Sequence, residues 1–223
     1  MKSFISEDNI EQAICNRLSQ PEYGWKRIEC SPELEDQDEV ASTGRANASE
    51  CILPEVFLSA LRRLNPQIDD EILKNILQDF RKDYSGTDMV DTNYKFYNQI
   101  RNGIKVKTRN QHREDFDIVK LIDFDHPERN DFHCVNQMWI KGHFRYRRPD
   151  VLLFVNGLPV VFIELKNSTV KIEESYNKNL VSYRKDIPNI FAMNQICVLS
   201  NGLQTKIGAW NAGYEFFFEW LRV

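Results

Sequence analysis

The sequence predicts an α/β protein, with mixed α+β character, in which helices flank a central mixed sheet. Two neighbouring segments, residues 151–155 and 160–165, are apolar on both faces, as expected for central strands that are covered on each side. Helical spacing precedes these strands, and a polar helix-prone segment at residues 170–185 follows them. With 223 residues and 42% hydrophobic content, the chain can form one large domain with a substantial core.

The first third of the chain is expected to be mainly helical. Ser6 is a candidate N-cap, followed by apolar Ile10, Ile14 and Leu18 on one face of a first helix. Residues 28–50 lack apolar periodicity and predict a long, mobile loop. Helical spacing then recurs twice and predicts a helical hairpin, at residues 53–64 and 69–84. We expect this hairpin to belong to a helical insertion of about residues 53–101 between the first helix and the sheet.

Strand-like patterns begin near residue 104. Residues 118–124 and 132–146 alternate imperfectly between apolar and polar side chains, which predicts strands that enter the sheet. The two fully apolar segments come next and should pair as a central hairpin. After the crossover helix, which stops before Pro188, residues 195–200 form another buried strand, and residues 205–210 are its expected hairpin partner.

Composition excludes several classes of protein. The five cysteines are odd in number, far apart and never in a Cys-x-x-Cys pair, which argues against a disulfide framework and a structural zinc site. The four histidines have no metal-binding spacing either. No apolar run approaches the ~20 residues of a membrane helix, and the N-terminus does not resemble a secretion signal. We therefore expect a cytoplasmic protein with reduced thiols and no membrane partner.

The net charge of −4 does not favour a nucleic-acid partner, but the charges are unevenly distributed. The segment KGHFRYRR, residues 141–148, holds four fixed positive charges and no acid. Such a run is usually a solvated face. Because it leads directly into Asp150, we expect a local DNA-facing patch that includes Arg145, Arg147 and Arg148.

Three charged residues stand at the ends of the two central strands. Asp150 precedes the first strand, and Glu164 and Lys166 end the second in the only Glu-x-Lys of the chain. Two carboxylates and an amine are the set that metal-dependent phosphodiester hydrolysis requires. Asp150 and Glu164 would bind Mg²⁺, with the backbone carbonyl of Leu165 as a third ligand, and Lys166 would offset charge and activate water. The alternative is an ordinary surface salt bridge worth ~0–1 kcal/mol.

The site depends on the register of the central hairpin. If residues 156 and 157 formed a two-residue turn with unbroken pairing, Asp150 would lie opposite Ile163 and face away from Glu164. One extra residue, in a three-residue loop or a β-bulge, would place Asp150 opposite Glu164. The hypothesis therefore predicts an irregularity between the two strands.

At these residues the sequence resembles the PD-(D/E)xK nuclease superfamily, and more closely the N-terminal nuclease region of type I restriction-modification R subunits. The resemblance rests on RRPDVLLFVNGLPVVFIELKN, SYRKDIPNIF and NQICVLSNGLQTKIGAW. It implies a restriction-endonuclease-like core, a catalytic set of Asp150, Glu164 and Lys166, Mg²⁺, and double-stranded DNA as substrate. It also implies methyltransferase and specificity subunits as partners. R subunits continue into an ATP-driven motor, and this chain has no phosphate-binding Gly-x4-Gly-Lys-Ser/Thr loop. We therefore expect the nuclease domain alone, with ATP needed only by the motor.

The family's Gln-x3-Tyr motif appears here as Asn179 and Tyr183. Four residues apart on a helix, the two share a face and could touch DNA or brace the site, the alternative being an ordinary polar helix face. Some related nucleases carry an extra acid on the first helix, but we interpret Glu7 and Glu11 as a solvated face. Two other functions stay open: a DNA-binding or assembly module without catalysis, and another enzyme of the superfamily such as a resolvase or repair nuclease.

Overall fold

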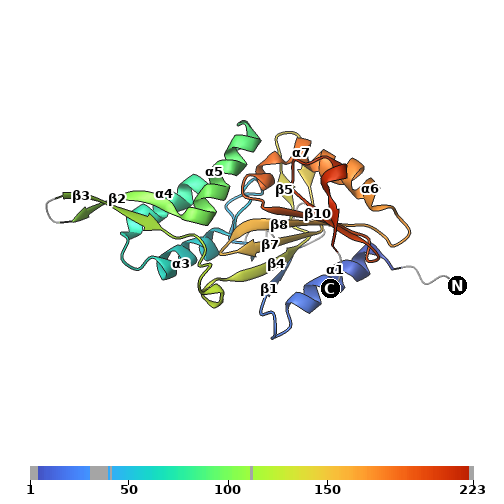
Figure 1. The fold of residues 1–223 in the computed structure, drawn as a ribbon, viewed down its shortest axis with the longest axis horizontal. Coiled ribbons are helices and arrows are strands. Elements are labelled where there is room, and N and C mark those ends of the chain that lie inside the picture. Colours follow the sequence, from blue (N-terminus) through green and yellow to red (C-terminus); the bar gives the residue numbers. More distant parts are fainter. Residues whose placement is uncertain (1–4, 31–39, 41, 111–112, 221–223) are drawn as a thin grey trace.

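The computed structural model describes residues 5–30, 40, 42–110 and 113–220. Its centre is a seven-stranded mixed sheet in the order β1-β4-β7-β8-β9-β10-β11, with helices on both faces, which confirms the predicted α/β class (Figure 1). The α-helices are α1 (Glu7–Leu18), α3 (Pro54–Leu64), α4 (Asp70–Phe80), α5 (Met89–Asn102), α6 (Ile172–Glu174) and α7 (Val181–Asp186). The strands of the main sheet are β1 (Lys26–Glu29), β4 (Phe132–Asn136), β7 (Val151–Val155), β8 (Leu158–Leu165), β9 (Ile196–Ser200), β10 (Thr205–Gly208) and β11 (Phe218–Glu219).

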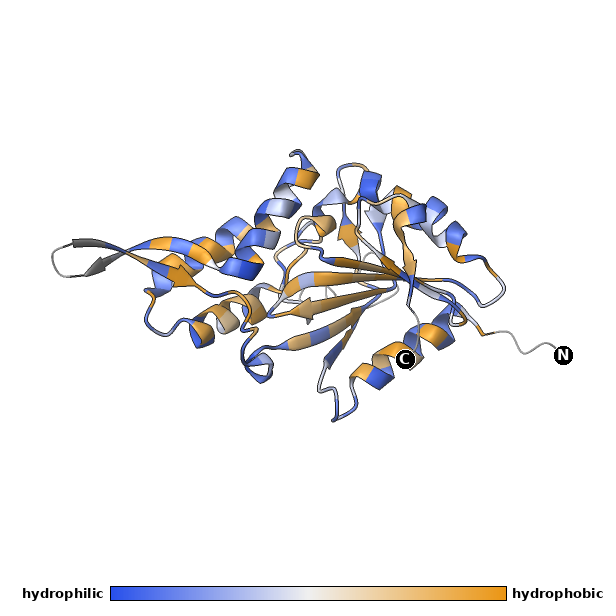
Figure 2. Ribbon diagram, viewed as in Figure 1, coloured by the Kyte–Doolittle hydropathy of each residue, from blue (hydrophilic) through white to orange (hydrophobic). Residues whose placement is uncertain are grey.

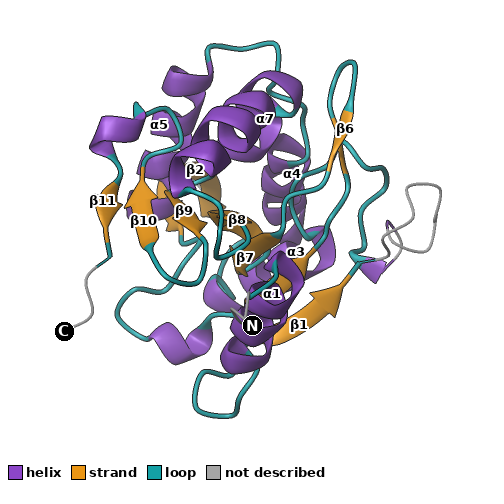
Figure 3. Ribbon diagram, turned by 90° about the vertical axis from the view of Figure 1, so that its right-hand side faces the viewer, coloured by secondary structure: helices purple, strands orange, loops and turns teal. Residues whose placement is uncertain are grey.

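Helix α1 covers one face of the sheet. Ser6 caps it as predicted, since its side chain accepts a hydrogen bond from the Asn9 amide at 3.2 Å. The buried side chains of the helix pack on alternate residues of the central strands, in a cluster of Ile10, Cys15, Cys134, Val151, Leu153, Ile163 and Leu165. The packing holds the N-terminus of α1 close to the end of β8 (Figure 3).

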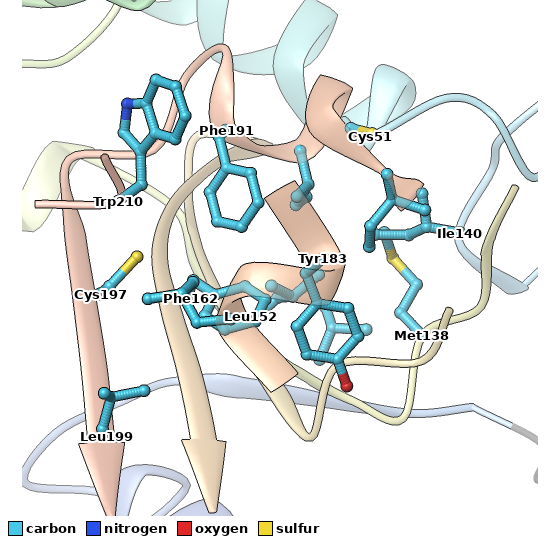
Figure 4. Packing of buried hydrophobic residues seen from close by; sticks show 14 of the residues in the cluster. Cys51, Met138, Ile140, Leu152, Phe162, Tyr183, Phe191, Cys197, Leu199 and Trp210 are labelled. Carbon is cyan, nitrogen blue, oxygen red and sulfur yellow. The ribbon is translucent and has the colours of Figure 1, made fainter. Parts of the chain in front are cut away.

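The opposite face is covered by the helix that follows β8. Here α6, a π-helical segment Ser175–Leu180 and α7 follow one another without a break. Phe162 of β8 packs edge-on against Tyr183 of α7, with ring centroids 5.4 Å apart, and both belong to the main core (Figure 4). Because β7 and β8 are covered on both faces, their side chains are apolar on both faces, as the sequence predicted (Figure 2).

A helical lobe lies beside the sheet. The predicted helical hairpin is confirmed as α3 and α4, and α5, which the sequence patterns did not single out, completes the lobe. A separate two-stranded hairpin, β2 (Ile104–Asn110) with β3 (Arg113–Val119), extends from it (Figure 1). Phe57, Phe80 and Phe96 form the centre of the core of the lobe.

Three of the predicted elements were wrong in part. The expected loop at residues 28–50 begins inside β1, which pairs in parallel with β4; residues 31–39 and 41 lie outside the described part of the chain. Only residues 118 and 119 of the predicted strand 118–124 are in a strand, since Asn65 hydrogen-bonds both the amide and the carbonyl of Lys120. The expected strand 132–146 is divided into β4, β5 (Ile140–Lys141) and β6 (Tyr146–Arg147), after a left-handed Gln137 with φ 60°. Strands β9 and β10 pair as an antiparallel hairpin, as predicted.

The β7–β8 hairpin combines a tight turn with a bulge. Asn156 and Gly157, with φ of 50° and 80°, form a two-residue turn, and Val155 pairs with Leu158. The register then shifts between Leu153 and Phe154, which leaves Val160 as the extra residue on β8. Beyond the bulge, Val151 pairs with Ile163. The predicted irregularity is therefore present, as a bulge and not as a longer loop.

Across the described ranges, no helix is long and apolar enough to cross a membrane.

Candidate active site

The bulge brings the two predicted carboxylates together. Continuing the pairing of Val151 with Ile163 by one residue places Asp150 opposite Glu164, on the same face of the sheet. The Leu165 amide donates a hydrogen bond of 2.6 Å to Oδ2 of Asp150 and fixes this carboxylate against the end of β8. A strand end, a register shift and one backbone hydrogen bond therefore position the acid pair.

Glu164 is almost fully buried, with 1% of its surface exposed. Its Oε1 accepts hydrogen bonds from the Asn179 side-chain amide and from the Lys166 ammonium, the latter at 3.2 Å. Its Oε2 has no hydrogen-bond partner among the described residues. A buried carboxylate oxygen without a partner is costly and indicates a position where a further donor or a cation would bind.

Lys166 lies over the same end of β8. Its Nζ is 2.6 Å from the carbonyl oxygen of Leu165 and 3.2 Å from Oε1 of Glu164. A third oxygen, Oε2 of Glu7, is 3.8 Å away. The ammonium thus sits among the oxygens of Glu164 and Leu165 that the sequence predicted as metal ligands, and partly neutralises them.

Helix α1 contributes two acids that the sequence interpretation left out of the site, and for Glu11 the expectation of a solvated face was wrong. Glu11 is 5% exposed, and its carboxylate accepts hydrogen bonds from the side chains of Asn136, at 2.9 Å, and Gln137. Glu7 exchanges two hydrogen bonds with Asn167, just after Lys166. The spacing of four residues between Glu7 and Glu11 indicates that the two acids share one face of α1. Only the packing of α1 shows that this face turns toward the sheet and the site.

The site opens into an acidic cleft of about 420 Å³, lined by Glu7, Asp8, Glu11, Gln12, Glu29, Cys30, Asn136, Gln137, Arg148 and Asp150. Five of these side chains are acids and one is a guanidinium, so the cleft favours a cation. A larger cleft of about 720 Å³ lies beside α5, but its walls are mainly apolar and include a single acid, Asp123. We therefore place the candidate site in the smaller cleft.

The two carboxylates hold protons more tightly than ordinary acids. Burial raises the pKa of Glu164 to about 8, with a further increase from the negative charge of Asp150 and opposing effects from Lys166 and Tyr183. Burial also raises the pKa of Asp150 to about 6, although the hydrogen bond from the Leu165 amide and the positive charge of Lys166 both act to lower it. Without a cation, the folded protein therefore disfavours a fully ionised pair.

The donor set fits a hard divalent cation. Mg²⁺ is bound through one or two carboxylates and retains several waters, so it does not need an all-protein cage. Asp150 and Glu164 supply the carboxylates, and the unpartnered Oε2 of Glu164 supplies a free acceptor. Within the described residues no three His, Cys, Asp or Glu side chains converge closely enough to hold a metal ion by themselves. A site made of Asp150, Glu164, the Leu165 carbonyl and water molecules agrees with the unpartnered oxygen of Glu164 and with the lack of a third converging ligand side chain among the described residues.

Asn179 and Tyr183 both reach toward the carboxylates from the helix after β8. Asn179 lies in the π-helical segment, where the wider turn directs its amide to Glu164. Tyr183 is buried, and its hydroxyl donates a hydrogen bond of 3.3 Å to the Arg148 carbonyl. Burial and the nearby charges of Glu164 and Asp150 raise the pKa of Tyr183, so it stays protonated. Bracing of the site accounts for these contacts, and a direct contact with DNA stays a prediction.

The three arginines predicted to face DNA have different surroundings. Arg147 forms an ion pair with Asp186, with Nε 2.7 Å from Oδ2. Arg148 lines the acidic cleft, and its guanidinium lies 5.0 Å from the centre of the Trp139 ring. Arg145 is exposed between β5 and β6. Arg148 is therefore the one that the structure brings to the carboxylates.

A Glu164→Gln variant should lose much of the pH dependence of stability. In the metal-free wild type, folded Glu164 keeps a proton that the unfolded chain releases above its ordinary pKa of 4.5. The free energy of unfolding should therefore fall as the pH rises from about 4.5 to about 8, by the order of a few kcal/mol. Urea unfolding between pH 5 and 9 measures this slope. The exposed Glu173→Gln should keep the wild-type slope, and an unchanged slope in Glu164→Gln would contradict the assignment.

The fold and the site together define an α/β protein with a paired-carboxylate centre. The model of the family described as Type I restriction enzyme R protein N terminus (HSDR_N) matches residues 4–216. The chain belongs to this family.

Relatives with curated names extend the comparison. The Type I restriction enzyme HindI endonuclease subunit of Haemophilus influenzae is 29% identical over 221 residues, which cover 97% of this chain and 20% of that protein. The Putative type I restriction enzyme MjaIXP endonuclease subunit of Methanocaldococcus jannaschii is 30% identical over 226 residues, again 97% of this chain and 20% of the relative. The chain thus spans about a fifth of the length of these relatives.

Proposed function

We propose that this chain is the metal-dependent nuclease domain of a type I restriction enzyme R subunit, and that it hydrolyses phosphodiester bonds of double-stranded DNA. The observation that carries the proposal is the acid pair, in which the buried Glu164 has an oxygen without a partner among the described residues and lies opposite the half-buried Asp150. Membership of the R-protein N-terminal family and relatives named as endonuclease subunits support it. The PD-(D/E)xK pattern of Asp150, Glu164 and Lys166 agrees with the same assignment.

The acid pair would hold Mg²⁺ through Asp150, Glu164 and the carbonyl of Leu165. When bound, the ion would supply positive charge to a phosphate oxygen and lower the pKa of a water. The raised pKa values of Asp150 and Glu164 fit this role, because a cation favours the ionised pair that the apo protein disfavours.

Lys166 is the side chain that would act on the phosphate and the attacking water directly. Its ammonium is held by Oε1 of Glu164 and the carbonyl of Leu165, so it has a fixed position beside the acid pair. There it would bind a phosphate oxygen, offset the charge that develops during attack and orient the attacking water. The water oxygen forms a bond to phosphorus as the bond to the leaving sugar oxygen breaks, and that oxygen takes up a proton. Asn179 keeps the Glu164 carboxylate in place.

The proposal includes the wider complex that the family resemblance implies. Methyltransferase and specificity subunits would be the protein partners, and ATP would serve the motor region of an R subunit. A DNA-binding or assembly module that lacks catalysis is the alternative, as is another PD-(D/E)xK enzyme such as a repair nuclease or resolvase. A module without catalysis gains nothing from a buried Glu164 and a half-buried Asp150 that lower its stability at neutral pH, so we prefer the nuclease.

Asp150→Asn is the test of the proposal. The wild-type chain should bind Mg²⁺, measured by calorimetry at pH 8, and convert supercoiled plasmid to nicked or linear DNA in Mg²⁺ but not in EDTA. The variant removes one of two charged ligands, so we expect at least about tenfold weaker Mg²⁺ binding and at least about a hundredfold slower cleavage. Asp125→Asn, at an exposed acid of the segment between β3 and β4, serves as the control. Wild-type metal binding and cleavage by folded Asp150→Asn would refute the proposal.

A further inference from the structure

The connection between β5 and β6 carries an aromatic ring that faces solvent. Phe144 is 90% exposed, the highest value among the large hydrophobic side chains that the structure describes. We propose that Phe144 stacks on an unstacked base of the DNA bound at Asp150 and Glu164, and that Lys141 and Arg145 contact the neighbouring phosphates. This inference rests on the proposed nuclease function and adds a contact that the acid pair does not supply.

The ring projects from a fixed base. In the β5–β6 hairpin, Lys141 pairs with Tyr146, and the Gly142 amide donates a hydrogen bond of 2.8 Å to the Arg145 carbonyl. Gly142 also packs so tightly on α7 that a Cβ there would lie 1.7 Å from the carbonyl oxygen of Asp186. The Arg147 ion pair with Asp186 fastens the other side of the hairpin. The exposure of Phe144 therefore comes from a well-anchored turn.

The hairpin that carries the ring is rich in cations and has one further exposed aromatic side chain. Tyr146 is 39% exposed, and the Lys141 ammonium lies 5.8 Å from the centre of its ring. Lys141 and Arg145 are both exposed, and neither makes an ion pair with any residue in the described part of the chain. The His143 ring contacts Phe144 edge-on at 4.3 Å between centroids. The segment 141–148 contains no acid. A protein-docking patch would present a broad apolar surface, whereas exposed aromatic rings on a short hairpin with cations and no acid match a base flanked by phosphates.

The hairpin lies within reach of a substrate at the acid pair. Phe144 and Asp150 are six positions apart in the sequence, which limits the distance between their Cα atoms to roughly 20 Å. That span corresponds to about six base pairs at a rise of ~3.4 Å. The intervening chain passes through Arg148, which lines the acidic cleft. The hairpin lies against α7, the helix that carries Tyr183 behind the site. One DNA molecule can therefore touch both places.

The experiment compares the binding of two DNA duplexes by fluorescence anisotropy, in EDTA so that no cleavage occurs. One duplex of 30 base pairs is fully paired, and the other carries two unpaired central nucleotides. Stacking on a base is worth ~1–3 kcal/mol, so Phe144→Ala should bind the duplex with unpaired nucleotides roughly 5- to 150-fold more weakly. Phe144→Trp should restore affinity. Phe116→Ala, at another exposed phenylalanine beneath the Lys105 ammonium, should stay within about twofold of wild type.

Several results would overturn the proposal. They are the absence of binding by wild type to either duplex, equal binding by wild type and Phe144→Ala, and equal losses in Phe144→Ala and Phe116→Ala. A dimer of wild type in solution that Phe144→Ala abolishes, with DNA affinity unchanged, would assign the ring to protein association. Because binding is measured without metal, these outcomes are distinct from failure of the nuclease proposal, which would show as wild-type metal binding and cleavage by Asp150→Asn.

Discussion

Replacing Lys166 with alanine should slow DNA cleavage by roughly a hundred- to a thousandfold while preserving Mg²⁺ binding. The ammonium lies 3.2 Å from Oε1 of Glu164 and 2.6 Å from the carbonyl of Leu165, so it competes with a metal for the same oxygens. Its removal takes away the group that would stabilise charge on the phosphate and also takes away this competition. We therefore expect Mg²⁺ affinity equal to wild type or somewhat higher at pH 9.

The comparison variant is Glu164→Gln, which removes a ligand and should weaken both Mg²⁺ binding and cleavage. Calorimetry and plasmid cleavage, with both variants shown to be folded by circular dichroism, give the two readouts. Lys171→Ala, at an exposed lysine of the following segment, controls for the loss of one positive charge. Should Lys166→Ala lose metal binding in parallel with Glu164→Gln, Lys166 would be a structural partner of the acid and not a separate chemical group.

Gly157→Ala should cause the largest loss of stability. Gly157 has φ +80°, and an added Cβ would lie 2.6 Å from the Leu53 carbonyl oxygen and 2.8 Å from the Phe57 amide nitrogen. The left-handed backbone costs ~1–2 kcal/mol for a residue with a Cβ, and the overlap with backbone adds ~1–3 kcal/mol. The turn also accepts a hydrogen bond of 2.9 Å from the Leu53 amide, which the strain would disturb. Thermal unfolding should shift down by roughly 5–15 °C.

Gly24→Ala separates the cost of the left-handed backbone from the cost of the overlap with neighbouring backbone atoms. Gly24 has a similar φ of +69°, but no atom lies within 4 Å of its hypothetical Cβ. It should therefore show only the smaller, conformational part of the loss, measured by the same thermal scan and by urea titration. Equal losses at the two positions would show that the overlap of the added Cβ with Leu53 and Phe57 costs nothing, contrary to this prediction.

The sequence was sufficient for the elements whose signals are local. Strands β7 and β8 are apolar on both faces because helices cover both, and Ser6 caps α1 by contacts within one turn. Strand β1 could not be predicted in this way, since its four residues become a strand by pairing with β4, about a hundred residues along the chain. Non-local pairing leaves little trace in a four-residue pattern.

The residue types of the candidate site could be predicted from the sequence. Its geometry could be predicted only on the condition that the hairpin contains an irregularity. Asp150, Glu164 and Lys166 stand out as charges at the ends of buried strands. The bulge at Val160 is marked only by the adjacent Pro159, which indicates an irregularity but does not distinguish a bulge from a longer loop. Glu11 was missed because its burial depends on which face of α1 meets the sheet. The π-helical segment that directs Asn179 to Glu164 has no pattern of its own that differs from an α-helix.

The bulge makes the length of the β7–β8 hairpin a matter of parity. Inserting or deleting one residue between Val155 and Val161 would either remove the shift at Val160 or add a second one, and Asp150 would then point to the face opposite Glu164. Inserting or deleting two residues would restore the alternation. This hairpin can therefore change length without separating the two acids only in steps of two residues.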